Sequence, residues 1–164
     1  MSRTGAPRPE PIDASAERVA VVASRWHTTI MDGLIDGARR ACADSGAPEP
    51  DLIRVPGSFE LPFGAVTAID RGFSCVVALG VVIRGQTPHF DYVCRGATDQ
   101  LARLTVDTRT PIGFGLLTCD TEEQALARAG LPDSIEDKGY EAASAALHLT
   151  HHHQHHPHLA RGVT

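Results

Sequence analysis

Four short segments of the chain are almost continuously apolar and rich in β-branched residues, a pattern that predicts strands buried on both faces of a sheet. The third segment is the longest and most apolar, which favours a central place in the sheet. The four predicted strands are Val19–Ala23, Leu52–Val55, Cys75–Ile83 and Ile112–Leu117.

Between these segments, apolar residues recur at intervals of three or four, as on helices that bury one face. Gly46 follows the first of these stretches as a helix-ending glycine, and Thr121 with Gln124 forms a capping box that begins a short helix. The expected helices cover about residues 30–42, 60–70, 90–104, a short stretch after 121, and 136–149.

Strands that alternate with helices predict a parallel sheet with helices on both faces, because parallel neighbours are joined by right-handed crossovers. We therefore expect an α/β fold, a three-layer α/β/α sandwich with a four-stranded parallel sheet in the flavodoxin-like order 2-1-3-4. In such sheets, ligands bind outside the carboxyl ends of the strands. This side of the sheet is called the carboxyl edge below.

The 164 residues, 42% of them hydrophobic, suit one domain with an ordinary core. A formal net charge of −5 argues against binding to nucleic acid or to an anionic membrane surface. No apolar run is long enough to cross a membrane. We expect a mobile, Pro-rich arm at residues 1–13 that is not a signal peptide, an α/β domain at 14–150, and a disordered His-rich tail at 151–164.

Four cysteines lie apart in the sequence and form no Cys-x-x-Cys pair. Two disulfides would suit the even number, whereas four free buried thiols would suit the cytoplasmic location that we expect. The residues concerned are Cys42, Cys75, Cys94 and Cys119.

Three loops should meet at the carboxyl edge, at residues 24–27, 56–60 and 84–89. Trp26, the single tryptophan, offers a flat ring that could stack on a heterocycle, although a lone tryptophan also suits a core. Glu60 could accept hydrogen bonds from ring N–H groups of a ligand, or simply occupy the first turn of a helix, where a negative charge is favourable.

The loop after the third strand has the features of an anion site. Thr87 suits an N-cap, Pro88 suits the first helical position, and Gly85 permits a tight turn. Free N–H groups of Gln86 and Thr87 at the positive end of the helix would bind a phosphate; the alternative is an ordinary capped helix. His89 follows in the first turn, where it could transfer protons near neutral pH or be a plain surface histidine.

Further candidates are weaker on sequence grounds. Arg128 and Lys138 could bind an anion or simply face solvent, and His27 is noted because it adjoins Trp26. The P-loop, H-E-x-x-H and G-x-S-x-G motifs are all lacking, and we expect no metal site.

Two segments resemble the signature blocks of the 6,7-dimethyl-8-ribityllumazine synthase family. They are Val-Pro-Gly-Ser-Phe-Glu-Leu-Pro at 55–62 and Gly-Val-Val-Ile-Arg-Gly-Gln-Thr-Pro-His-Phe-Asp-Tyr-Val at 80–93. Residues 121–125, 128–130 and 137–139 resemble its C-terminal blocks, and the match runs in register over about residues 18–147. The second block is long, which makes the resemblance specific.

The resemblance implies a transferase of riboflavin biosynthesis that needs no cofactor. The reaction condenses 5-amino-6-(D-ribitylamino)uracil with 3,4-dihydroxy-2-butanone 4-phosphate, and releases the lumazine, phosphate and water. A heterocycle, a polyol and a phosphate are also what the three loops suggest. The alternative functions are a non-catalytic lumazine- or flavin-binding protein on the same fold, and a metal-binding scaffold led by the His-rich tail.

The family's residue roles transfer to matching positions of this chain. The resemblance implies that His89 moves protons, that Trp26 stacks on the pyrimidine, and that Phe114 covers the heterocycle. The ribityl chain would be bound by Ser58, Phe59 and Glu60, the pyrimidine by backbone groups of Val81, Val82 and Ile83, and the phosphate by Gln86, Thr87 and Arg128. Lys138, His27 and Gly85 remain further candidates.

Phe114 lies inside a predicted strand and Arg128 on a later helix, so neither needs to reach the carboxyl edge of its own subunit. In the family, the site lies between adjacent subunits of a pentamer, and members form pentamers, pairs of pentamers or shells of sixty subunits. The link at 131–137 is longer than in the shell-forming members and contains Pro132. We expect a homopentamer rather than a shell, with riboflavin synthase as a possible partner.

The tail departs from the family pattern. Six of the nine histidines fall within residues 151–158. A solvated tail without a defined role is the simplest interpretation, and binding of Zn²⁺ or Ni²⁺ by imidazoles is the alternative.

Overall fold

The computed structural model describes residues 10–155 and confirms the predicted sheet. All strand pairs are parallel, and the order across the sheet is β2-β1-β3-β4. The most apolar strand, β3, is central and pairs with both β1 and β4. The strands are β1 Val19–Ser24, β2 Asp51–Val55, β3 Cys75–Ile83 and β4 Ile112–Cys119.

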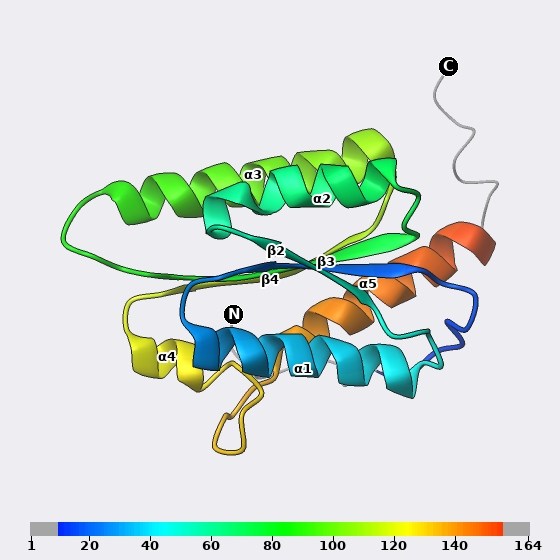
Figure 1. Cartoon of the computed structure of the whole chain (residues 1–164), viewed down its shortest axis with the longest axis horizontal. Coiled ribbons are helices and arrows are strands. Elements are labelled where there is room, and N and C mark those ends of the chain that lie inside the picture. The colour runs from blue at the N-terminus through cyan, green and yellow to red at the C-terminus, as the bar shows by residue number, and fades with distance from the viewer. Residues whose placement is uncertain (1–9, 156–164) are drawn as a thin grey trace.

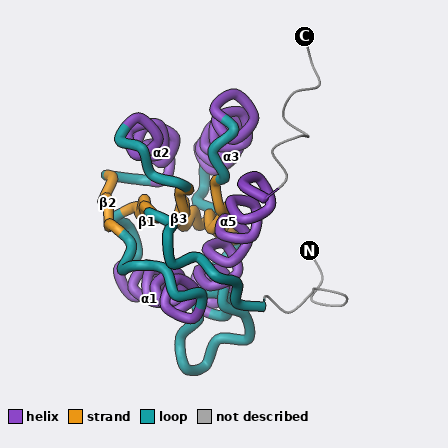
Figure 2. Tube along the Cα trace, turned by 90° about the vertical axis from the view of Figure 1, so that its right-hand side faces the viewer, coloured by secondary structure: helices purple, strands orange, loops and turns teal. Residues whose placement is uncertain are grey.

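Helices cover both faces of the sheet and give the expected three layers. In Figures 1 and 2, α2 and α3 lie on one face, and α1 and α5 lie on the other, where Figure 1 also places the short α4. The helices are α1 Thr28–Asp44, the 3₁₀ turn η1 Ser58–Glu60, α2 Leu61–Asp70, α3 His89–Thr108, α4 Glu122–Leu126 and α5 Lys138–His155.

The core forms two clusters, one on each face, because side chains alternate along each strand. Val21 and Val77 face α1 and α5, where the fully buried Leu34 and Leu147 join them. On the other face, a second cluster forms around Leu61 and its neighbours from α2 and α3. The strands are thus buried on both faces, as their continuous apolar sequences predict.

Most helices begin or end at the capping residues that the sequence predicts. Gly46 adopts a left-handed φ of 71° just after α1, a conformation that favours glycine. Thr121 Oγ1 accepts a hydrogen bond from the Gln124 amide at 3.3 Å and so caps α4. The start of α3 was predicted one residue too early: Pro88, not Thr87, is the N-cap, and no side chain caps this helix.

The predicted boundary of the tail at residue 150 is wrong. Helix α5 continues through residues 151–155, five residues into the expected tail, while residues 156–164 lie outside the described part. The expected N-terminal arm falls mostly on residues 1–9, which are also outside it. Residues 10–13 contact the domain: Ile12 packs against the core, and the Glu10 carbonyl oxygen lies 2.7 Å from His148 Nε2.

All four cysteines are free thiols, and three of them are buried. Burial raises the pKa of the Cys75 thiol to about 12 and that of Cys42 to about 11, so these thiols stay protonated and unreactive near neutral pH. Over residues 10–155, no helix combines the length and apolar character that a membrane span requires.

Candidate active site

A cavity of about 500 Å³ lies at the carboxyl edge, where the loops after β1, β2 and β3 meet. It brings together nine of the residues predicted from sequence: Trp26, His27, Ser58, Phe59, Glu60, Val81, Val82, Ile83 and His89. This carboxyl-edge cavity lies where the topology of a parallel sheet predicts a ligand site.

Trp26 belongs to this cavity and not to the core. Its side chain is 67% exposed, which leaves a ring face free to stack on a planar ligand. The next residue, His27, is the N-cap of α1 and adopts a left-handed φ of 57°. Such backbone strain in a residue other than glycine is common at functional sites, and here it turns the chain sharply between β1 and α1.

The loop after β2 is held against the end of β3. The Ser58 hydroxyl donates a hydrogen bond to the Val81 carbonyl oxygen at 3.2 Å. Gly57 allows a close approach, because a β carbon there would lie 3.0 Å from Glu60 Oε2 and 3.7 Å from Trp26 Nε1. The indole N–H and the Glu60 carboxylate therefore flank the same short stretch of backbone, ready to bind polar groups of a ligand.

His89 opens α3 and lines the same cavity with two residues that the sequence analysis missed, Tyr92 and Val93. Helical spacing could have found both, because residues three and four positions after His89 share its face. The exposed imidazole is accessible to a ligand that lies against Trp26 and Glu60.

Arg84 fixes the base of the loop between β3 and α3. Its guanidinium forms ion pairs with Asp120 at 2.7 Å and Asp91 at 3.3 Å and lies over the Phe90 ring at 4.1 Å. The hydrogen bond to Asp120, followed by that to Asp91, raises the pKa of Arg84. The exposed stretch from Gly85 to Pro88 then projects beyond the sheet (Figure 1).

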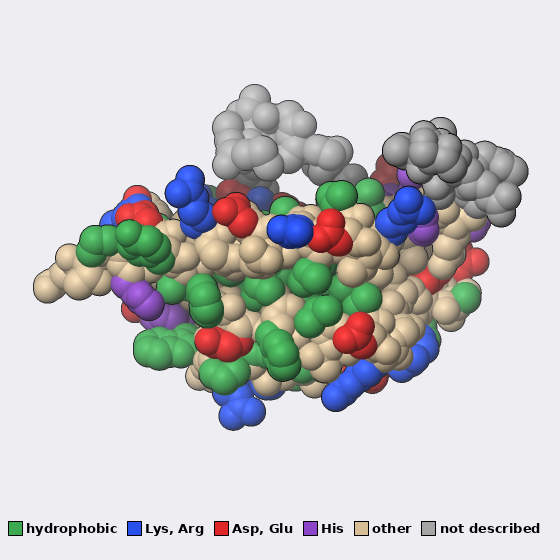
Figure 3. All heavy atoms as spheres, turned by 90° about the horizontal axis from the view of Figure 1, so that it is seen from above, with side chains coloured by type: hydrophobic (Ala, Val, Ile, Leu, Met, Phe, Trp, Pro, Cys, Tyr) green, Lys and Arg blue, Asp and Glu red, His purple; other side chains and the backbone are tan. Residues whose placement is uncertain are grey.

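The predicted phosphate ligands Gln86 and Thr87 lie on this projecting loop, outside the lining of the carboxyl-edge cavity, as does Gly85. Figure 3 looks onto the α2 and α3 face, and shows histidine and hydrophobic side chains next to one another at the end where the loop projects. One chain therefore presents a heterocycle-sized cavity and, beside it, an exposed polar loop.

Phe114, Arg128 and Lys138 line a second cavity, of about 690 Å³, between β4, α4 and the start of α5. Phe114 is 48% exposed although it lies within a strand, because β4 is an edge strand. The structure therefore separates these three residues from the carboxyl-edge cavity. We call this second hollow the β4 cavity.

The two cations of the β4 cavity differ in their surroundings. Lys138 Nζ lies 2.6 Å from a carboxylate oxygen of both Glu136 and Glu141. Burial acts to lower the pKa of Lys138, but the hydrogen bonds to these two carboxylates outweigh it and raise the pKa. Arg128 instead donates to the backbone carbonyl of Gln124 at 2.8 Å, a bond that leaves its positive charge uncompensated. Arg128 is thus better suited than Lys138 to bind an anion.

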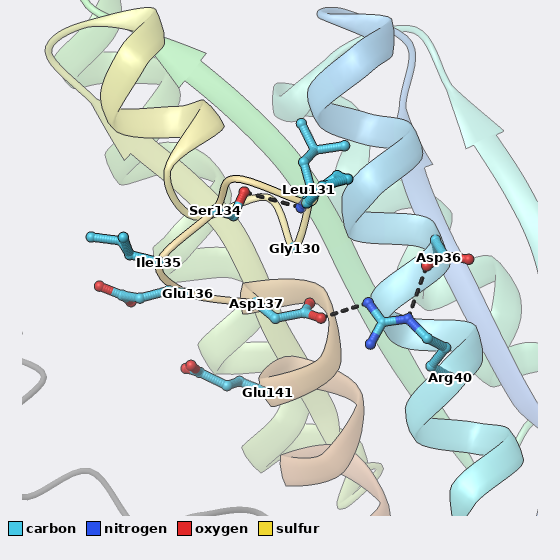
Figure 4. A pocket seen from close by; sticks show the side chains of 10 residues that line it. Asp36, Arg40, Gly130, Leu131, Ser134, Ile135, Glu136, Asp137 and Glu141 are labelled. Atoms are coloured by element: carbon cyan, nitrogen blue, oxygen red, sulfur yellow. Dashed lines mark hydrogen bonds and ion pairs between the residues drawn. The ribbon is translucent and has the colours of Figure 1, made fainter.

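Figure 4 shows a third cavity, of about 590 Å³, beneath the link between α4 and α5. Arg40 joins the two sides: its guanidinium contacts Asp36 at 2.9 Å and Asp137 at 2.6 Å. Asp137 also accepts a hydrogen bond from the Tyr140 amide at 3.0 Å and so caps α5. The polar groups of this third cavity bond to one another, and these bonds hold the link between α4 and α5 against α1.

Over residues 10–155, no group of three or more His, Cys, Asp and Glu side chains is placed to hold a metal ion. At the carboxyl edge, Trp26, Glu60, His89 and backbone groups offer stacking, hydrogen bonding and proton transfer.

Comparisons with known proteins identify the family. Residues 16–154 match the family described as 6,7-dimethyl-8-ribityllumazine synthase. A relative from Kocuria rhizophila is 64% identical over 149 residues, covering 90% of this chain and 95% of its own. A relative from Streptomyces coelicolor is 58% identical over 147 residues, covering 90% and 91%. Both have that same name. This chain therefore belongs to the 6,7-dimethyl-8-ribityllumazine synthase family.

Proposed function

We propose that the chain is a transferase that forms 6,7-dimethyl-8-ribityllumazine, the penultimate step of riboflavin biosynthesis. It condenses 5-amino-6-(D-ribitylamino)uracil with 3,4-dihydroxy-2-butanone 4-phosphate and releases phosphate and water. The observation that most supports this function is the carboxyl-edge cavity, in which an exposed indole, a carboxylate and an imidazole meet. The names of relatives at 58–64% identity agree with it.

In this proposal, the pyrimidine stacks on Trp26 and meets backbone groups at the end of β3, at Val81, Val82 and Ile83. The ribityl chain extends along Ser58, Phe59 and Glu60, where the carboxylate accepts hydrogen bonds from its hydroxyls. This assignment replaces the bond between Glu60 and ring N–H groups suggested by the sequence alone. Gly96 allows the Phe59 ring to lie close to α3, because a β carbon at this glycine would lie 3.0 Å from Phe59 Cε2.

The chemistry needs protons moved at defined atoms. The amine of the pyrimidine attacks the ketone, an imine forms with loss of water, elimination expels phosphate, and closure of the second ring releases another water. His89 is the proton-transferring residue, because its imidazole lines the cavity at the base of the phosphate loop. A positioned imidazole contributes about 10²–10⁴-fold to such transfers.

The phosphate site is completed by a second subunit. Gln86 and Thr87 offer N–H groups on the exposed projecting loop, whereas Arg128 offers a guanidinium in the β4 cavity, whose lining does not include the loop. The family's assembly into oligomers resolves this separation. The β4 cavity, with Phe114 and Arg128, is proposed to close over the carboxyl-edge cavity of the neighbouring subunit, and a head-to-tail contact of this kind repeats around a ring.

The exposed aromatic residues support such an interface. Trp26, Phe59 and Tyr92 are largely exposed at the carboxyl-edge cavity, and Phe114 is half exposed in the β4 cavity. Exposed apolar patches mark ligand or protein contacts. We propose a cytoplasmic homopentamer; a pentamer is favoured over a sixty-subunit shell by the length of the link at 131–137, which contains Pro132. Riboflavin synthase is a possible docking partner. Sedimentation that gives the mass of a sixty-subunit shell would refute the pentamer.

The function is tested by the rate of lumazine formation from the two purified substrates, for the wild type and for His89→Ala. The wild type should form product, and the variant should lose about tenfold or more. Equal rates for the wild type and His89→Ala would show that His89 does not transfer protons in the reaction. A wild type that binds lumazine but forms none would instead favour the non-catalytic binding protein.

A further inference from the structure

Two imidazoles lie against each other near the C-terminal end of α5. The ring centroids of His151 and His155 are 4.0 Å apart, with 32° between the ring planes. Two histidines four positions apart on a helix can bind one metal ion together, because both side chains project from the same face. We propose that His151 and His155 chelate a divalent transition-metal ion at a site separate from both cavities of the proposed active site.

The helix that presents the pair is anchored up to the preceding residue. Leu147 and Thr150 are buried, and the Thr150 hydroxyl donates to the Ala146 carbonyl oxygen at 2.9 Å. His151 is half-buried and His155 is exposed. One imidazole is thus held near the domain while the other adjusts to the ion, and this partial preorganisation reduces the entropy lost on binding.

The N-terminal segment supplies polar groups beside this helix end. His148 Nε2 lies 2.7 Å from the Glu10 carbonyl oxygen. The Ser15 hydroxyl donates a hydrogen bond to the Asp13 carboxylate at 2.8 Å in the same segment.

The donor set defines the class of ion. Imidazole suits Zn²⁺, Ni²⁺ and Cu²⁺, with Cu²⁺ bound most tightly in the usual order of stability. Within residues 10–155 no cluster of three or more such ligands exists, so the ion would have two protein ligands and complete its shell with water. Such an open site differs from the closed four-ligand sites that stabilise folds.

The helix also supplies a matched control. His153 lies between the two proposed ligands in sequence, but Leu149 precedes it by four positions and Pro157 follows it by four. His156 follows His153 by three positions but is replaced in the parent protein used below, so in that parent His153 has no histidine three or four positions away. A site made by the pair would tolerate the loss of His153, whereas binding by histidine content alone would not distinguish the three residues.

The test is calorimetric titration of NiCl₂ into the full-length chain with His156 and His158 replaced by alanine, at a pH above the ordinary imidazole pKa of about 6.5. His151→Ala and His155→Ala should each weaken the tightest binding by at least about tenfold, since even outer-shell losses cost 10–100-fold. His153→Ala should leave it unchanged. Equal far-UV circular dichroism would show that all the variants remain helical.

The proposal is overturned if the parent takes up no Ni²⁺, if either ligand variant binds as tightly as the parent, or if His153→Ala weakens binding as much as the other two.

Discussion

Replacing Gly80 with alanine should strain the junction between the central strand β3 and the loop that lines the carboxyl-edge cavity. A β carbon at this position would lie 2.8 Å from Ser58 Oγ, 2.9 Å from Leu61 Cδ1 and 3.0 Å from Leu116 Cδ1. Non-bonded carbon atoms prefer about 3.5–4.0 Å. All three neighbours are buried, so none can move into solvent to make room.

Two opposing effects set the size of the change. Overpacking a core costs about 1–3 kcal/mol, while exchanging glycine for alanine restricts the unfolded chain and returns about 0.4–1 kcal/mol. The net loss in the free energy of unfolding is on the order of 1 kcal/mol, which lowers Tm by about 2–4 °C for a chain of this length. Displacement of Ser58 should also raise KM for the pyrimidine substrate.

Thermal unfolding of Gly80→Ala and wild type at equal protein concentration measures this loss, because Tm of an oligomer depends on concentration. Gly85→Ala is the matched control: no heavy atom lies within 4 Å of a β carbon placed there. A Gly80→Ala protein as stable as Gly85→Ala would refute the close packing of Ser58, Leu61 and Leu116 around β3.

Three further changes test other parts of the structure. Trp26→Ala should weaken binding of the ribitylaminouracil by about 5–150-fold in titration, since stacking on an aromatic ring contributes about 1–3 kcal/mol; unchanged affinity would exclude stacking. The pKa of the Cys75 thiol is about 12 in the folded chain, against the ordinary thiol pKa of about 8.5 in the unfolded chain. Between these values only the unfolded chain loses the proton, so the free energy of unfolding should fall as pH rises, and Cys75→Ala should show a smaller fall in urea unfolding. Asp137→Ala removes the cap of α5 and should lower the free energy of unfolding by about 0.5–2 kcal/mol; equal urea midpoints would contradict the capping role.

The sheet was predictable because its signals are local and consistent. The continuous apolar sequence of Cys75–Ile83 leaves no polar face, so the strand had to be central. The alternation of strands and helices predicts a parallel sheet, and the expected flavodoxin-like order 2-1-3-4 is the one that the structure shows. Trp26, His27, Glu60 and His89 were predictable because the topology of a parallel sheet brings the loops after three strands together. The other five predicted residues of the carboxyl-edge cavity came only from the family resemblance.

Other features depended on contacts that the sequence does not display. The left-handed turn at His27, beside the exposed Trp26, and the ion pairs of Lys138 with two carboxylates are such features. The extension of α5 was missed because a run of histidines resembles a solvated tail. Positive side chains are nevertheless favourable near a helix C-terminus, so the run gave no reason for the helix to stop at residue 150.

The central claim is that one active site needs two subunits, with His89 from one and Arg128 from its neighbour. His89→Ala and Arg128→Ala should each have little activity, and joint refolding should produce mixed oligomers. Roughly a quarter of the interfaces in a random ring would then pair two intact halves. We predict that lumazine formation rises to roughly a quarter of the wild-type rate. Activity that stays at the mean of the two variants, in oligomers shown to be mixed, would contradict the shared site.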